Sequence, residues 1–257
     1  MSKVTGEQAT KSVAETYAKM ISSQTEESLN EAYLPYYNYL RAWKKGTSGV
    51  DKKYGQGFSS KSGDELSSHV FSHEANNLGK QADKSGLHHH HMMAHYGHLH
   101  AADEADNAKD SKAAAHHRSE AERHKSAAGA APQLHESTIT EAKSKTASYE
   151  DHRKAADHAF NDAVDIGDTA NGDEGQMYDA HPKKLGHDRK HELSWHPGGQ
   201  HNVHMLAHHA YLHAAHLHKV AASHAPDAQS KKFHTNDIKS SLSLAKDHLD
   251  AANALKK

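Results

Sequence analysis

The stretch that decides the fold is His91-Met-Met-Ala-His-Tyr-Gly-His-Leu-His-Ala-Ala102, because it occurs again as His204-Met-Leu-Ala-His-His-Ala-Tyr-Leu-His-Ala-Ala215. Eight of the twelve positions are identical in the two copies. The match extends backwards to His88 and His201, and further to Gly86 and Gly199. Because internal repeats indicate repeated structural units, we interpret the chain as containing a duplication.

Histidines recur on one face of both copies when the repeat is placed on a helix of about 100° per residue. They are His88, His91 and His95 in the first copy and His201, His204 and His208 in the second. They share an arc of roughly 100° with Met and Leu, which is typical of a core-facing helix surface. We therefore predict two amphipathic helices that bury imidazoles among apolar side chains. If these helices face each other, the two histidine triplets meet.

Three interpretations of this histidine seam stay open. The rings could form hydrogen bonds between alanine-rich helices, they could hold a metal ion, or they could make the seam sensitive to pH. Protonation of all 29 histidines would change the net charge from −2 to +27. Because neutral buried imidazoles resist protonation, we expect stability to fall between about pH 6.5 and pH 4.5. We expect a second set of histidines to face solvent: His116, His117, His124 and His152.

The composition argues for helices and against most catalytic classes. Apolar residues make up 35% of the 257 residues and aromatic residues 6%, and much of the apolar share is alanine, so the core should be thin. There is no cysteine, which excludes disulfides, thiolate metal sites and thiol nucleophiles. The near-neutral charge does not predict a nucleic-acid surface, and no apolar run is long enough to span a bilayer. The first residues also lack the apolar centre of a signal peptide, so we expect no export by that route.

Hydrophobic periodicity and helix-breaking residues predict helices along the chain and no strand. The expected helices cover residues 5–21, 25–45, 64–84, 87–128, 137–164, 200–224 and 236–255. We expect residues 166–199 to be irregular because glycine and proline are frequent there. Ala75-Asn76 and Ala170-Asn171 suggest that the helices before the two copies correspond at a separation of 95 residues. The predicted fold class is all-α: an elongated helical bundle built from two duplicated αα-hairpins plus N- and C-terminal helices.

Three regions follow from this pattern. Residues 1–45 form an N-terminal helical module, residues 46–63 form a glycine-rich linker, and residues 64–257 form the hairpin bundle. Within the bundle, the first copy covers about 64–128, the second about 150–225, and the last helix 236–255. The N-terminal module carries an aromatic cluster that we expect to contact the bundle or a partner, since such side chains are common in contacts. The cluster is Tyr33, Tyr36, Tyr37, Tyr39 and Trp43.

No catalytic motif is complete. His191-Glu192 lacks the second histidine at the spacing of a zinc protease, since Trp195 stands in its place. Glu120 and His124 miss by one residue the Glu-x-x-His spacing of di-metal helical bundles. We therefore expect no enzyme activity and no resident cofactor, with adventitious Zn, Ni or Cu at histidine pairs. The triplets His88, His91, His95 and His201, His204, His208 are the weak metal candidates.

One resemblance points to a function. Ser72-His-Glu-Ala-Asn76, then Gly86, then the His- and Ala-rich repeat resembles the Ala/His-rich helical hairpins in structural proteins of tailed bacteriophages. The resemblance covers roughly residues 64–128 and 150–225 and implies no catalytic residue. It implies a virion component of the head, decoration or connector, made in the host cytoplasm and packed against itself and other virion proteins. It implies neither a membrane partner nor sequence-specific nucleic-acid binding. The alternative is a His-rich metal-binding or metal-storage bundle.

Overall fold

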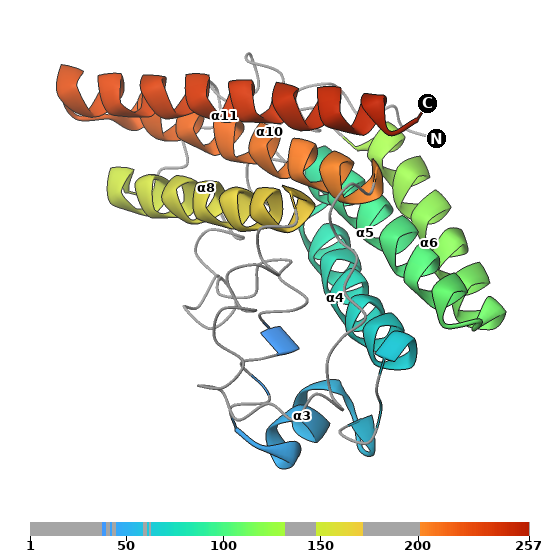
Figure 1. Cartoon of the computed structure of the whole chain (residues 1–257). Helices are drawn as coiled ribbons and strands as arrows, with labels where there is room; N and C mark the ends of the chain where they lie inside the picture. The colour runs from blue at the N-terminus through green and yellow to red at the C-terminus, as the bar shows by residue number, and fades with distance from the viewer. Residues whose placement is uncertain are drawn as a thin grey trace, which may run out of the picture.

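A computed structural model describes residues 38, 39, 42, 45–58, 61, 63–131, 148–171 and 201–256. These residues form seven helices, and no strand occurs among them (Figure 1). The prediction of an all-α, bundle-like fold is confirmed. The helices are α3 (Thr47–Tyr54), α4 (Gly63–Ser85), α5 (His88–Asn107), α6 (Ser111–Ala130), α8 (Tyr149–Asn171), α10 (His201–His224) and α11 (Ala228–Ala254).

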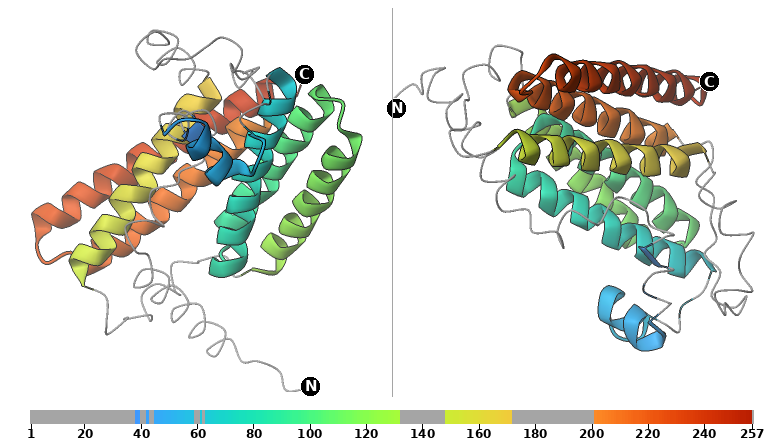
Figure 2. Two further views of the ribbon diagram at one scale, coloured as in Figure 1. Left: turned by 90° about the horizontal axis from the view of Figure 1, so that it is seen from below. Right: turned by 90° about the vertical axis from the view of Figure 1, so that its left-hand side faces the viewer.

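The two repeat helices, α5 and α10, lie at the centre of the bundle. Helix α5 packs against α4 and α6, helix α10 packs against α8 and α11, and α5 and α10 pack against each other (Figures 1 and 2). The pairs α4–α5 and α8–α10 are the pairs that the sequence predicts as hairpins. Each repeat helix also has an outer neighbour, α6 or α11, so the units are groups of three helices. That these units arose by duplication stays a prediction.

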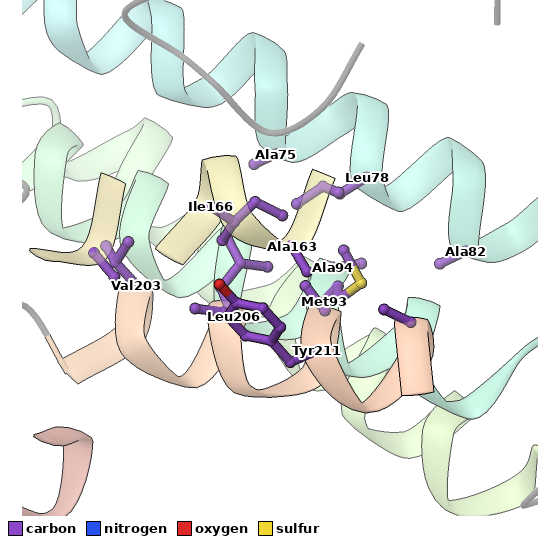
Figure 3. Packing of buried hydrophobic residues seen from close by; sticks show 14 of the residues in the cluster. Ala75, Leu78, Ala82, Met93, Ala94, Ala163, Ile166, Val203, Leu206 and Tyr211 are labelled. Atoms are coloured by element: carbon purple, nitrogen blue, oxygen red, sulfur yellow. The ribbon is translucent and has the colours of Figure 1, made fainter. Parts of the chain in front are cut away.

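The main core is built largely from alanine. Helices α4, α5, α8, α10 and α11 all contribute to it, and Ala75, Ala94 and Ala163 are among its fully buried members (Figure 3). Leu206, Ile166 and several other apolar side chains fill the remaining space. Small side chains allow helix axes to approach toward the short end of the usual spacing of about 8–10 Å. The core is therefore maintained by close backbone approach, and its larger side chains are few.

The helix expected over residues 87–128 is interrupted, and this part of the prediction is wrong. Helix α5 ends at Asn107, and α6 begins at Ser111 and folds back along α5. Lys109 has a left-handed backbone, φ 60°, and the amide of Asp110 donates to the carbonyl of Ala105 at 2.8 Å. This is the hydrogen-bond pattern of a helix C-terminus that glycine usually occupies. Because residue 109 is a lysine, the sequence did not mark the end of a helix there. The Asp110 side chain caps the start of α6 by accepting from the Ala113 amide.

Two other boundaries differ from those expected. Helix α11 begins at Ala228 and not near residue 236, because the Asp227 carboxylate caps it by accepting from the Ser230 amide at 2.7 Å. Helix α8 continues to Asn171, so residues 166–171 are helical and not irregular. Helix α4 runs unbroken through Gly79 and ends before Gly86, which has a left-handed φ of 63°. Gly86 thus ends the helix as predicted.

The N-terminal aromatic cluster is described only at Tyr39. That ring is 1% exposed and packs with Val50 and Phe58 against Leu66 and Val70 of α4. Helix α3 lies within the residues expected to be a linker, so residues 46–63 are not an irregular connection throughout. The cluster members Tyr33, Tyr36, Tyr37 and Trp43 lie outside the described residues, as does the helix expected over residues 5–21. Of the helix expected over residues 25–45, only residues 38, 39, 42 and 45 are described, and the first three of these are helical.

Two glycines, one in α4 and one in α8, have similar surroundings. A Cβ atom at Gly79 would lie 3.0 Å from His124 Nε2 and 3.2 Å from His98 Nε2. A Cβ atom at Gly167 would lie 2.9 Å from the Tyr211 hydroxyl and 3.0 Å from the Nε2 atom of His248. Each glycine therefore makes room for two rings of the neighbouring helices. Matching α4 to α8 by these two glycines gives an offset of 88 residues between the helices, whereas the Ala-Asn pairs predicted an offset of 95 residues.

Filling the space at Gly79 tests this close packing. We expect Gly79→Val to destabilise the fold by about 1–3 kcal/mol, because its side chain overpacks the two imidazoles. Gly129→Ala is the control, since Gly129 is exposed on α6 and its Cβ would meet nothing within 4 Å. That change should leave stability unchanged or raise it by less than the roughly 0.5–1 kcal/mol of a mid-helix position, since Gly129 lies in the last turn of α6. Urea unfolding followed by circular dichroism measures both, and a Gly79→Val variant as stable as the native chain would contradict the packing.

Candidate functional site: two histidine seams

The repeated histidines of α5 join this helix to α6 through four ring contacts. Ring–ring contacts alternate with contacts from a ring to a backbone carbonyl. They are His88 Nδ1 to Ala128 O (2.9 Å), His91 Nδ1 to His124 Nδ1 (3.0 Å), His95 Nδ1 to Ala121 O (2.8 Å) and His98 Nδ1 to His117 Nδ1 (3.0 Å). We call this set the first seam.

The same alternation joins α10 to α11. The contacts are His201 Nδ1 to Ala252 O (2.9 Å), His204 Nδ1 to His248 Nδ1 (3.0 Å), His208 Nδ1 to Ala245 O (2.8 Å) and His218 Nδ1 to His234 Nδ1 (3.0 Å). We call this set the second seam. Where the first seam has His98, the second has Tyr211, which stacks on His248 with ring centroids 5.6 Å apart. The first seam has the corresponding stack of His98 on His124, also at 5.6 Å.

Helical spacing explains the alternation. Along α5 the seam residues follow one another at intervals of three, four and three, and along α6 at intervals of four, three and four. This is the spacing at which two helices meet in a coiled-coil contact. Ala121 and Ala128 occupy alternate seam positions of α6, and their methyl groups leave the backbone carbonyls within reach of His95 and His88. A larger side chain at those positions would cover the acceptor.

Proton positions in the seams follow from the contacts. A carbonyl accepts only, so His95 must carry its proton on Nδ1 to donate to Ala121. When two Nδ1 atoms face each other, as in His91 and His124, one ring must donate and the other must accept. A seam of neutral rings is therefore fully compatible with these contacts. Protonation of both rings of a pair would place two N–H groups against each other.

Burial lowers the pKa of nine histidines in the two seams. It lowers the pKa of His98 to about 3 and those of His117, His124 and His248 to about 4, since the charged imidazolium loses solvation inside the protein. Nearby positive charge adds to the effect, from His117 on His98 and from Arg123 on His124. Burial also lowers the pKa values of other seam members: His91, His95, His204, His218 and His234.

A further group of histidines lies where α5 meets α10. His90 Nε2 contacts His213 Nε2 at 3.1 Å, while His90 Nδ1 contacts the Ser85 hydroxyl at 2.7 Å. Tyr96 stacks on His209, with ring centroids 5.6 Å apart. Burial lowers the pKa of His90 to about 4, that of His209 to about 2, and that of His213 well below its usual value. The contact between the two units is thus also built from neutral imidazoles.

The structure does not bring the two predicted triplets together. Helices α5 and α10 do pack against each other, but His88, His91 and His95 point to α6, and His201, His204 and His208 point to α11. Ring contacts between α5 and α10 include His89 with His209 and His90 with His213. Of the triplet members, His88 also meets His209, and His201 also meets Tyr96, but within the described helices no triplet histidine contacts one of the other triplet. The triplet histidines contact the outer helices, because α6 and α11 supply alanine carbonyls and histidine rings at the matching spacing. Of the three interpretations of the seam, hydrogen bonding between alanine-rich helices therefore describes these contacts.

The set of histidines expected to face solvent is mostly buried. His117, His124 and His152 are 2%, 0% and 4% exposed, and only His116 lies in solvent. For His117 and His124 the expectation failed because a continuous helix over residues 87–128 would hold them far from His91 and His98. His152 is buried by stacking on His224 of α10, with ring centroids 4.4 Å apart. The intervals of three and four along residues 117–128, and the capping residue Asp110, were the signals in the sequence for a returning helix.

Three groups of side chains have the spacing to hold a metal ion. They are Asp83 with His91 and His124, then His98 with Glu120 and His124, and finally His218 with His234 and Asp237. In each group the ligand atoms lie within 4.8 Å of one another. Of the six weak metal candidates in the sequence, only His91 belongs to such a group. The other members of the three groups were not among the sequence candidates, because the sequence does not specify how their helices pack.

The depressed pKa values predict loss of stability in acid. A histidine whose folded pKa is below its unfolded value of about 6.5 binds its proton more readily in the unfolded chain. Its stabilising contribution is present above pH 6.5 and is lost as pH falls toward the folded value, about 4 for His124 and His248. Asp162 acts oppositely, because burial and the charge of Asp165 raise its pKa to about 7. Burial also raises the pKa of Asp103, Asp165 and Asp237. These four carboxyls are fewer than the histidines with lowered pKa values, so we expect net loss from pH 6.5 to pH 4.5.

A double variant tests whether the seams cause this loss. The slope of the unfolding free energy against pH counts the protons taken up on unfolding, at about 1.4 kcal/mol per pH unit for each proton. His124→Gln with His248→Gln should reduce that slope by up to two protons between pH 6.5 and pH 4.5. The control is His116→Gln, on the exposed face of α6. Equal slopes for the two variants would show that the histidines act only through net charge.

The described helices and the comparisons add two findings. Among residues 63–131, 148–171 and 201–256, no helix combines the length and apolar character needed to cross a membrane. Comparison of the chain with protein-family models, with curated proteins and with solved structures found no match to any of them.

Proposed function

We propose that this chain is a non-enzymatic structural protein of a tailed-phage virion, associated with the head, its decoration or the connector. It acts through helix packing with copies of itself and with other virion proteins. The observation that carries the structural role is the use of buried histidines as interhelical contacts in both seams. The resemblance of residues 64–128 and 150–225 to phage Ala/His-rich hairpins directs the proposal to the virion, where the chain arrives from the host cytoplasm.

The use of the imidazoles supports a structural role over a catalytic one. A general base near neutral pH needs a pKa close to 7 and a free lone pair near substrate. His95 and His248 have lowered pKa values, and their Nδ1 atoms face a carbonyl and another ring. Such rings pack and donate well but are poorly suited to proton transfer. The seams therefore serve cohesion between helices.

Apolar side chains exposed on the outer helix support association with other subunits. Phe233 and Leu242 on α11 are 51% and 48% exposed, and Leu255 at its C-terminal end is 44% exposed. Large apolar side chains on a helix that covers one edge of the bundle gain stability when a neighbour covers them. Because the alanine-rich core buries little area per residue, such neighbours would add substantially to the stability of each subunit.

Sedimentation velocity and analysis of particles test this role. We expect the purified chain to self-associate with increasing concentration, and Leu242→Glu to weaken the association by placing a charge in the apolar contact. Ser243→Glu, the neighbouring exposed position, is the control. Mass spectrometry of purified particles, from a phage that encodes the chain, should detect it in stoichiometric amount. A stable monomer that is never found in particles would contradict the proposal.

A second candidate function, a His-rich metal-binding or metal-storage bundle, is favoured by the three groups of metal-spaced ligands. Equilibrium dialysis with Zn²⁺, Ni²⁺ and Cu²⁺ separates the two functions. A storage protein would take up several ions per chain with similar affinity, whereas a structural protein would show weak uptake at its exposed histidines. Saturable uptake of many ions would favour storage over the virion role.

A further inference from the structure

One cluster in the second seam differs from the other ring pairs. His218 on α10 and His234 on α11 face each other, with 3.0 Å between their Nδ1 atoms. The Oδ2 atom of Asp237, one turn further along α11, lies 3.7 Å from His218 Nδ1. Both rings are buried, whereas the Asp237 side chain is 26% exposed. The three ligand atoms come together beside the short turn between α10 and α11, which keeps their backbones in register.

These separations suit a transition metal. Zn²⁺ binds imidazole nitrogen and carboxylate oxygen at about 2.0–2.2 Å, so neighbouring ligand atoms of a tetrahedral site are about 3.3 Å apart. The observed 3.0 Å between His218 and His234 and 3.7 Å between His218 and Asp237 lie on either side of that value. Movements of a few tenths of an ångström would therefore accommodate an ion. The exposed edge at Asp237 leaves room for water as a fourth ligand.

The surroundings orient the His234 ring and enclose the His218 ring. The Tyr149 hydroxyl lies 3.1 Å from His234 Nε2, so the ring can keep its proton on Nε2 and present the Nδ1 lone pair. The Phe160 ring meets His218 edge-on, with centroids 6.0 Å apart, and gives the site an apolar wall. Metal binding needs both rings protonated on Nε2, so one ring changes its tautomer and the pair stays neutral.

One cation, the Arg123 guanidinium, already occupies the other two metal-spaced groups. Arg123 forms a two-pronged contact with Asp83, at 2.8 and 3.1 Å, and its Nε atom contacts Glu120 at 2.9 Å. Its Nη2 atom also lies 2.8 Å from His124 Nε2. A metal ion there would meet the guanidinium charge. No described lysine or arginine is paired with Asp237, so its carboxylate has no competing cation.

We propose that His218, His234 and Asp237 bind one divalent transition-metal ion of the Zn²⁺ type, which fastens α10 to α11 beside their connecting turn. The inference goes beyond the virion role, because a metal-fastened hairpin serves any assembly. Its failure would leave the test on particles unaffected. It also differs from storage, because the geometry provides one site and not many.

A matched pair of variants tests the site. Asp237→Asn removes the carboxylate ligand at a partly exposed position, so the fold should be retained. Asp247→Asn is the control, because Asp247 lies ten residues further along α11 beside His248, whose pair with His204 has the same 3.0 Å Nδ1 separation. In calorimetric titration with Zn²⁺, the native chain and Asp247→Asn should each bind one tight equivalent. Asp237→Asn should bind it about tenfold or more weakly.

Two further measurements identify the ligands. Co²⁺ in place of Zn²⁺ should give the intense visible absorption of a four-coordinate site, and Asp237→Asn should lose it. In nitrogen NMR spectra of the imidazoles, Zn²⁺ should shift the Nδ1 signals of His218 and His234 but not those of His204 and His248. Equal Zn²⁺ affinity for the two aspartate variants, or no tight equivalent in the native chain, would overturn the proposal.

Discussion

The contact between a neutral imidazole and its partner across a helix seam is the interaction on which the rest of the structure depends. Alanine cores bury little apolar area, so the outer helices need additional contacts to stay in place. The first seam provides them by directing Nδ1 at a carbonyl or at another Nδ1 every three or four residues, as in His91 with His124 and His95 with Ala121. The second seam does the same over its first three histidines. Each contact satisfies a polar group that burial would otherwise leave at a cost of about 1–3 kcal/mol.

This arrangement makes the stability of the fold depend on the protonation state of the histidines. Imidazole is the one side chain whose usual pKa lies near physiological pH, and burial in the seams lowers it, to about 3 for His98. The same desolvation that keeps the rings neutral makes them good packing groups at pH 7 and costly ones in acid. A leucine seam would give comparable burial without that dependence. The histidines therefore add directional contacts and sensitivity to pH together.

Much of the fold could be predicted from the sequence, because the repeated stretch carries a strong helical period and Gly86 marks a helix end. The repeat predicted the two central helices and the buried face that His91 and His204 share. It could not show which helix covers that face, since packing partners depend on tertiary contacts. The lysine at position 109 concealed the return of α6, because a left-handed residue there is usually glycine. The cluster of His218, His234 and Asp237 was missed for the same reason, as its members come from two helices.

The turn at residues 108–110 affects how α6 is aligned along α5. Because the first seam repeats every seven residues, sliding α6 along α5 by one repeat would again oppose His98 to His124 and His95 to Ala128. The slide would keep only two of the four contacts, because Ala102 and Ala105 would then face Ala121 and His117. Such a slide would move the centre of the hairpin by half that distance into α6, and so would break the Asp110 cap and the left-handed turn at Lys109. Three residues of connection and the complete set of four contacts thus select the same alignment.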